Sequence, residues 1–156
     1  MTTNDEREQR AAVDQEHPAA RVEEDHRTLR GQLDTIAAAT TRTALLDGLL
    51  AVPKILLEHF ALEEQIDGLY DDLRKRRPSL AVELDALLDQ HRLILDEFDA
   101  LSQKLQGRMD AERSVEQIAE PIMRDVSRWL ERLRRHEREE SSMIGVVYYT
   151  DDGGYG

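Results

Sequence analysis

Apolar residues recur along most of the chain at steps of three and four positions, which is the spacing of one face of an α-helix. Turn-forming residues interrupt this pattern at 40–42, 77–79 and 107–113. The breaks leave four helical segments of roughly 20 to 30 residues, a length typical of helix bundles. The pattern therefore predicts an all-α protein that folds as an antiparallel up-down-up-down four-helix bundle.

Each segment has one apolar seam, and the seams predict the core. Every seam also contains a histidine, and two contain a glutamate four positions after it. The predicted seams, in chain order, are Val22, His26, Leu29, Leu33 and Ile36; Leu45, Leu49, Val52, Leu56, His59, Glu63, Ile66 and Tyr70; Leu84, Leu87, His91, Ile94 or Leu95, Phe98, Leu101 and Leu105; and Ile118, Ile122, Val126, Trp129, Leu133, His136 and Glu140. The second seam continues to Tyr70, so one long helix is expected there.

Composition excludes several classes of function. The 156 residues carry 33 acidic and 21 basic side chains, a net charge of −12, which disfavours nucleic acid and anionic membranes as partners. Cysteine is absent, so disulfides, thiolate catalysis and cysteine-based metal sites are excluded. No apolar run reaches the ~20 residues of a membrane span, and the N-terminus lacks the apolar core of a signal peptide. We expect a cytoplasmic monomer or homodimer.

The polar residues on the seams need an explanation, because an ionised carboxylate in an apolar core costs several kcal/mol unless a partner compensates it. A divalent cation provides that compensation, and neutral imidazoles are common ligands of such ions. An imidazole and a carboxylate four positions apart are offset by ~6 Å along a helix and ~40° around it, so both reach one metal. A single histidine on an apolar face is usually a hydrogen-bonded core residue, whereas one on each of four seams favours a metal site.

The candidate ligands also form an internal repeat. Its halves are His26 with His59-x-x-x-Glu63, and His91 with His136-x-x-x-Glu140. A duplication of this kind predicts a pseudo-twofold bundle with a two-metal centre between its halves. The first three histidines fall at similar levels along the bundle. The fourth is displaced by ~9 Å if the third helix ends at Gly107, and the 107–113 connection or a kink at Pro121 has to absorb that difference.

With these motifs the sequence resembles the hemerythrin-like HHE cation-binding family, over about residues 18–145. The resemblance implies a non-haem di-iron centre of two iron ions (Fe2+/Fe3+), which an oxo or hydroxo bridge can join, with zinc as a less favoured alternative. The residues implied as terminal ligands are His26, His59, His91 and His136, and those implied as bridges are Glu63 and Glu140. The expected organisation is a flexible polar segment 1–16, the hemerythrin-like domain 17–147 and a mobile tail 148–156.

Two positions depart from the oxygen-carrying members of that family. Leu95 stands where they have a second histidine in the third helix, and Ser141 stands where they have an aspartate after the last histidine. The resemblance is therefore closer to the branch linked with iron sensing, nitric-oxide handling or peroxide chemistry. Four protein donors to each metal leave an octahedral ion about two open positions for O2, peroxide or NO.

Two functions are consistent with this sequence. The first is a di-iron protein that binds or reduces a small oxidant (O2, peroxide or NO), and peroxidase-like oxidoreductase activity is left open. The alternative is an iron-responsive or interaction module in which metal stabilises the fold and a partner recognises the folded state. No catalytic residue is predicted beyond the metal centre, because no nucleophile with a base and no phosphate-binding loop is evident.

Polar residues beside the predicted ligands have two interpretations. Glu64 and Glu139 each adjoin a predicted bridge and are candidates to support the ligands, but a solvated helix face explains them equally well. The same holds for Asp25 and Gln90, which each precede a predicted histidine ligand. Tyr70 is expected to pack rather than to donate electrons.

Overall fold

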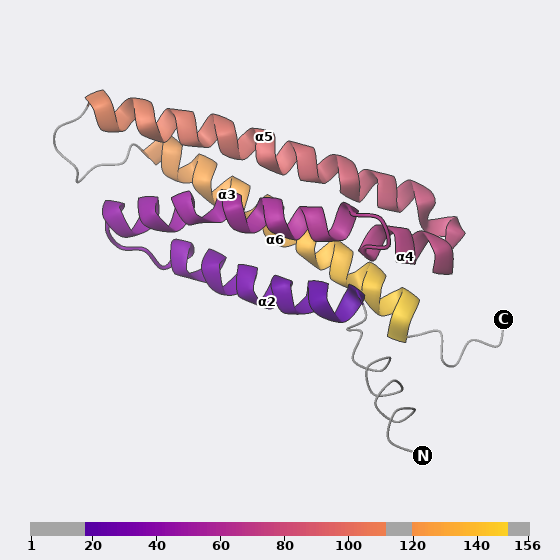
Figure 1. Cartoon of the computed structure of the whole chain (residues 1–156). Coiled ribbons are helices and arrows are strands. Elements are labelled where there is room, and N and C mark those ends of the chain that lie inside the picture. Colours follow the sequence, from indigo (N-terminus) through magenta and orange to yellow (C-terminus); the bar gives the residue numbers. More distant parts are fainter. Residues whose placement is uncertain (1–17, 112–119, 150–156) are drawn as a thin grey trace, which may run out of the picture.

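The computed structural model describes residues 18–111 and 120–149, in which four long helices pack as a bundle (Figure 1). The helices are α2 (Pro18–Ala37), α3 (Arg42–Glu64), α5 (Ala81–Ala111) and α6 (Glu120–Ile144), with the short helix α4 (Leu69–Arg76), the 3-10 turn η1 (Pro78–Leu80) and the π-helical turn η2 (Gly145–Tyr149). Helices α2 and α5 run in one direction and α3 and α6 in the other, which confirms the predicted up-down-up-down bundle. The expected segment 1–16 and the tail beyond residue 149 lie outside the described residues.

The core consists of two apolar clusters. The larger cluster contains Leu29, Leu33, Ile36, Leu45, Leu49, Val52, Leu56, Phe60, Ile94, Phe98, Leu101, Leu105, Ile122, Val126, Trp129, Leu130 and Leu133. The smaller cluster contains Ala19, Val22, Leu69, Tyr70, Leu73, Leu84, Leu87, Ile144 and Val147. On each of α2, α5 and α6 the histidine of the seam stands between residues of one cluster and residues of the other, so the predicted ligands form a polar layer between two apolar ones.

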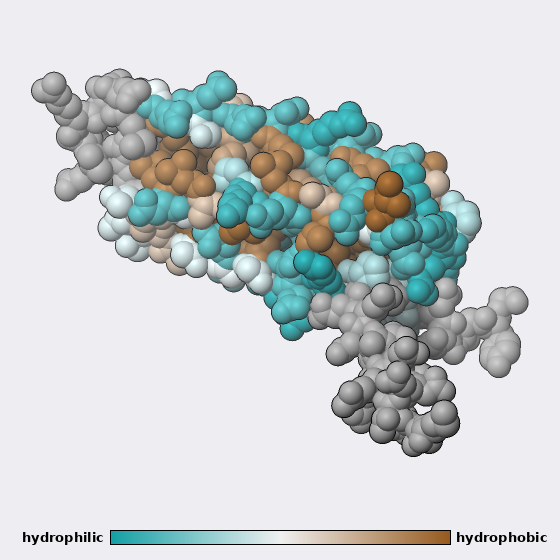
Figure 2. Space-filling model, viewed as in Figure 1, coloured by the Kyte–Doolittle hydropathy of each residue, from teal (hydrophilic) through white to brown (hydrophobic). Residues whose placement is uncertain are grey.

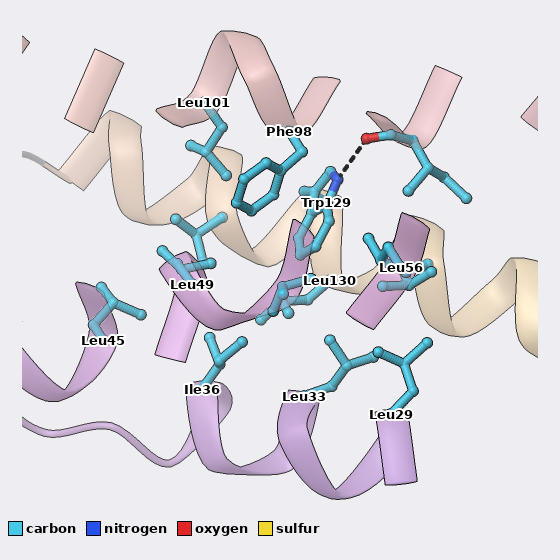
Figure 3. Packing of buried hydrophobic residues seen from close by; sticks show 14 of the residues in the cluster. Leu29, Leu33, Ile36, Leu45, Leu49, Leu56, Phe98, Leu101, Trp129 and Leu130 are labelled. Atoms are coloured by element: carbon cyan, nitrogen blue, oxygen red, sulfur yellow. Dashed lines mark hydrogen bonds between the residues drawn. The ribbon is translucent and has the colours of Figure 1, made fainter. Parts of the chain in front are cut away.

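The larger cluster is closed by the single tryptophan of the chain (Figure 3). Trp129 lies 4.9 Å from Phe98, centroid to centroid, and its indole N–H donates to the carbonyl of Ile94 at 3.0 Å. This bond satisfies the one polar group of the indole and removes the cost of burying it. The cluster can therefore exclude water from one side of the polar layer.

The prediction of one helix through Tyr70 is wrong. Helix α3 ends at Glu64, and a turn separates it from α4. As a result Ile66, predicted to be buried, is 87% exposed, whereas Tyr70 is buried in the smaller cluster. The buried positions that were expected on one straight helix are therefore divided between α3 and α4. Helix α4 contributes Leu69, Tyr70 and Leu73 to the smaller cluster.

Local backbone chemistry explains the turn. Asp67 has a φ of 60°, a left-handed conformation that aspartate tolerates better than most residues, and its N–H donates to the Asp71 carboxylate at 3.0 Å. A Cβ on Gly68 would lie 2.5 Å from the carbonyl oxygen of Leu62, so only glycine fits at the start of α4. The Asp67–Gly68 pair thus ends one helix and begins the next within a few residues.

The other helix boundaries agree more closely with the sequence. Thr41 caps α3, and its hydroxyl accepts from the N–H of Ala44 at 3.2 Å. Gly107, where a break was expected, lies inside α5, which continues to Ala111. The difference in level expected at His136 is not observed, because its Nε2 lies 3.1 Å from Nε2 of His91; residues 112–119, between α5 and α6, lie outside the described residues.

Hydrophilic and apolar residues are interspersed on the face of the bundle seen in Figure 2. In the described ranges no helix combines the length and the apolar character that a membrane span requires.

Candidate metal centre

All four helices of the bundle bring their predicted ligands to one point. These residues are His26 on α2, His59 and Glu63 on α3, His91 on α5, and His136 and Glu140 on α6. Every one of them is buried, and the two glutamates are 0% exposed. The core-facing seams that buried the leucines have therefore buried these polar side chains together.

The side chains form two overlapping groups, in each of which the candidate ligand atoms lie within 4.8 Å of one another. The first group is His26, His59, Glu63 and Glu140, and the second group is His91, His136, Glu63 and Glu140. Each histidine belongs to one group, while both glutamates belong to both.

The short contacts between histidine nitrogens and glutamate oxygens follow the same division into two groups. The short ones are His26 Nε2 to Glu140 Oε1 at 2.7 Å, His59 Nε2 to Glu63 Oε1 at 2.7 Å, His91 Nε2 to Glu63 Oε2 at 3.1 Å, and His136 Nε2 to Glu140 Oε2 at 3.3 Å. In both carboxylates, then, Oε1 faces the first group and Oε2 faces the second.

Although these buried atoms lie close to one another, several of them do not meet the geometry of a hydrogen bond. They are Nε2 of His26 and of His59, both oxygens of Glu63, and Oε1 of Glu140. A buried polar atom without a partner costs roughly 1–3 kcal/mol, so a native fold rarely collects five of them in one place without a further ligand. Nitrogen and oxygen donors whose lone pairs converge in this way fit iron or zinc.

The electrostatics couple the histidines to the glutamates. Burial lowers the pKa of His26, but the close contacts of its ring with the carboxylates of Glu140 and Glu63 outweigh it and raise that pKa to about 10. Burial also lowers the pKa of His91, but the same two carboxylates raise it to about 10. The pKa of His59 is raised as well. Burial opposes ionisation of Glu140, yet its hydrogen bonds hold its pKa well below the usual range. In the metal-free protein, protons therefore balance the buried carboxylates.

A polar side chain faces the other ring nitrogen of each histidine. These contacts are Ser141 Oγ at 3.2 Å from His26 Nδ1, Asp25 Oδ2 at 3.6 Å from His59 Nδ1, Glu64 Oε1 at 2.8 Å from His91 Nδ1, and Gln90 Oε1 at 2.8 Å from His136 Nδ1. At His26, His91 and His136 this contact is a hydrogen bond, and an acceptor at Nδ1 keeps the ring proton there and leaves the Nε2 lone pair free for a metal. Nδ1 of His59 has no hydrogen-bond partner among the described residues. Glu139 makes no hydrogen bond to a histidine among the described residues and instead accepts from Gln90 Nε2 at 3.1 Å.

Glu137 is a buried carboxylate that is not among the predicted site residues. This side chain is 4% exposed, and its Oε1 has no hydrogen bond among the described residues. Burial raises its pKa to about 7, although the charges of His26 and His59 act in the opposite direction. Glu137 precedes Glu140 by three positions, so the helical spacing already placed it beside the seam.

Aromatic side chains border the polar layer. Phe60, from the larger cluster, stacks on the His91 ring at 3.8 Å. Tyr70 packs in the smaller cluster as expected, and its hydroxyl also donates to Glu140 Oε2 at 2.5 Å and lies 3.3 Å from His91 Nε2. Burial and the charges of Glu140 and Glu63 raise the pKa of Tyr70, so this phenol keeps its proton in the metal-free protein.

Two surface grooves reach the outer edges of the second group. One lies between α3 and α5, has a volume of about 510 Å³ and is lined in part by Leu57, Glu64 and His91. The other lies between α5 and α6, has a volume of about 430 Å³ and is lined in part by Gln90 and His136. Solvent therefore comes within one side chain of the buried site.

A four-helix bundle with histidines and glutamates buried between its helices defines a class of cation-binding helical proteins. The chain belongs to the hemerythrin family, because it matches the Hemerythrin HHE cation binding domain over residues 17–147. Matches were found neither among curated proteins nor among solved structures. The family match confirms the resemblance indicated by the sequence, and the buried histidines and glutamates are its candidate cation site.

Proposed function

We propose that this cluster binds two iron ions and that the centre binds or reduces a small oxidant such as O2, peroxide or NO. The observation that carries the proposal is that the two glutamates are shared between two ligand groups whose histidines differ. One metal would need only one group, whereas two adjacent metals explain both groups and the opposite directions of the carboxylate oxygens.

In this proposal the histidines are terminal ligands and the glutamates are bridges. Glu63 directs Oε1 towards His59 and Oε2 towards His91, which belong to different groups. Glu140 makes the corresponding contacts to His26 and His136. Each metal position then has four protein donors, so an octahedral ion keeps open positions for a small ligand.

The protein contributes orientation and exclusion of water. Glu64 and Gln90 hold the rings of His91 and His136 with Nε2 directed inward, so little reorganisation is needed when a metal binds. Apolar clusters on both sides of the polar layer keep bulk water away from it. Two iron ions at this position would supply electrons and open coordination positions for reducing a small oxidant.

Metal content and peroxide consumption test this proposal. Protein purified from an iron-replete host is expected to contain two irons per chain and to consume added peroxide. Glu63→Ala should lower the occupancy of both positions, whereas His26→Ala should lower mainly one, because a bridge touches two metals and a terminal ligand one. A zinc-only protein, or equal iron losses in the two variants, would contradict the assignment.

A second function is supported by the continuity between the site and the C-terminal part of the chain. Ser141 contacts His26, and five residues beyond Glu140 the chain continues as η2, whose Val147 packs in the smaller cluster. Metal binding could thus set the conformation of a surface that a partner recognises. A large metal-dependent gain in thermal stability with no peroxide consumption would favour this iron-responsive role over the redox one.

A further inference from the structure

The two metal positions are not equivalent, because a phenol lies beside one of them. Tyr70 Oη is 2.5 Å from Glu140 Oε2 and 3.3 Å from His91 Nε2, and both of these atoms face the second group. Among the described residues, no tyrosine makes a corresponding contact with His26 or His59. The pseudo-twofold repeat of histidines and glutamates is therefore broken by one side chain.

The separations around Tyr70 are those of neighbouring ligands on one ion. Adjacent donors of a six-coordinate metal with bonds of ~2.1 Å lie ~3 Å apart. In the second group, His91 Nε2 is 3.1 Å from His136 Nε2, and His136 Nε2 is 3.3 Å from Glu140 Oε2. Tyr70 Oη is as close to this set of atoms as its members are to one another.

The position of this hydroxyl is fixed by the fold. The tyrosine ring is anchored with Leu69 and Leu73 in the smaller cluster, and its edge meets the His91 ring at 76° with centroids 5.6 Å apart. The turn at Asp67–Gly68 sets the start of α4, and so the direction of the ring. A buried phenol needs a hydrogen-bond partner, and the partner of Tyr70 is a carboxylate of the candidate ligand set rather than a backbone carbonyl.

We propose that Tyr70 is a fifth protein ligand of the metal held by His91 and His136, and that the exogenous oxidant binds at the other metal, held by His26 and His59. When ferric iron binds, the bond between Oη and the metal forms, the O–H bond breaks, and the proton passes to bulk water. The first position then has four protein donors and the second has five. This inference rests on the proposed two-metal site.

Ferric iron bound to a phenolate absorbs visible light through a charge-transfer transition, and this gives a direct test. The loaded, oxidised wild-type protein is expected to show such a band, with phenolate vibrations enhanced when it is excited in a Raman experiment. Tyr70→Phe keeps the packed ring and should lose both features while it still binds two irons. Tyr148→Phe is the matched control. The Tyr148 hydroxyl donates to Asp72 and not to the buried histidines and glutamates, so this variant should leave the band unchanged.

The stoichiometry of a small ligand tests the second half of the proposal. Where a bridging hydroxide takes one further position on each ferric ion, five protein donors leave the second ion no open position and four leave the first ion one. The oxidised wild-type protein should therefore bind one azide ion per two irons, and Tyr70→Phe should bind two. Two irons per chain with no phenolate band, or the same azide stoichiometry in wild type and Tyr70→Phe, would overturn the role of Tyr70 and leave the two-metal site standing. Failure of the wild-type protein to bind two metals would overturn both.

Discussion

The contacts behind the histidines determine which ring nitrogen a metal can use. Gln90 accepts from His136 Nδ1 at 2.8 Å and itself donates to Glu139 at 3.1 Å, so its amide is fixed in one orientation. Residues in this position raise the basicity of the imidazole and hold its ring. The contribution of Gln90 to metal binding is therefore larger than its half-buried position alone indicates.

Replacing Gln90 by leucine removes that acceptor while it keeps a side chain of similar size. We expect Gln90→Leu to weaken metal binding by roughly 10-fold to 100-fold, the usual effect of losing such a contact. Zn2+ titration against a competing chelator measures it. Gln103→Leu, at an exposed position of the same helix, is the control and should bind as the wild type does. Equal affinities in the two variants would show that the His136 ring needs no support.

At the residue scale, the sequence predicted which side chains meet but not what lies behind them. The spacing of His136 and Glu140 is local to one helix, so periodicity alone places both on the seam. The contact between Gln90 and His136 joins residues 46 positions apart and depends on how α5 and α6 are rotated against each other. No pattern within one helix contains that rotation, so the sequence alone supports both interpretations of Gln90.

The turn between α3 and α4 sets the direction of the Tyr70 side chain, whose hydroxyl lies beside Glu140 and His91. A Cβ on Gly68 would meet backbone oxygens of Leu62 at 2.5 Å and of Gln65 at 2.8 Å, and backbone cannot move aside as a flexible side chain can. Gly68→Ala should therefore destabilise the protein by about 1–3 kcal/mol. Thermal and denaturant unfolding of the metal-free protein measure this loss.

A second glycine supplies the control. Gly31 lies inside α2, and a Cβ there would meet nothing within 4 Å. Gly31→Ala should stabilise the protein by about 0.5–1 kcal/mol, because alanine loses less conformational freedom in a helix. If Gly68→Ala left the free energy of unfolding unchanged, the turn would be able to open without a loss of stability.

At the element scale, the sequence predicted the long helices and their order but not this turn. Ile66 and Tyr70 are four positions apart and fit the seam equally well, so periodicity placed both in the core. The close approach of Gly68 to Leu62 and the positive φ of Asp67 instead form a turn that leaves Ile66 exposed. Such backbone features cannot be recognised from the spacing of apolar residues. The Asp67–Gly68 dipeptide was the available indication of a turn.

Across the whole molecule, the metal-free site is a set of buried ion pairs at the centre of an apolar bundle. Replacing buried ion pairs by apolar residues of similar volume is often neutral or stabilising. We therefore expect the double variant Glu63→Leu/Glu140→Leu to bind no metal pair and to be at least as stable as the metal-free wild-type protein. Metal-to-protein ratio and melting temperature test this, and a double variant that still binds two irons would exclude bridging by the glutamates.

The same ion pairs make stability depend on pH, with opposite signs in the two metal states. The pKa values of His26 and His91 are raised from 6.5 to about 10 by folding, so their stabilisation is complete below about pH 6.5 and is lost as the pH rises through 10. The lowered pKa of Glu140 adds stability that is present above its ordinary value near 4.5 and is lost in acid. Metal-free protein should thus be most stable between roughly pH 5 and 6.5.

Above pH 6.5, bound metal reverses the dependence of stability on pH, because each histidine must release its proton before it can bind a metal ion. The rise in melting temperature on adding Zn2+, used here as a redox-inert probe, should therefore grow from pH 6.5 to pH 8.5, while the melting temperature in the presence of chelator falls. The double variant Glu63→Leu/Glu140→Leu serves as the control: without the carboxylates its histidines lose the cause of their raised pKa, so both slopes should flatten. If the chelated wild-type protein instead gained stability across this range, the folded state would bind fewer protons than the unfolded chain, so neither the histidines nor the glutamates would hold protons in the metal-free fold.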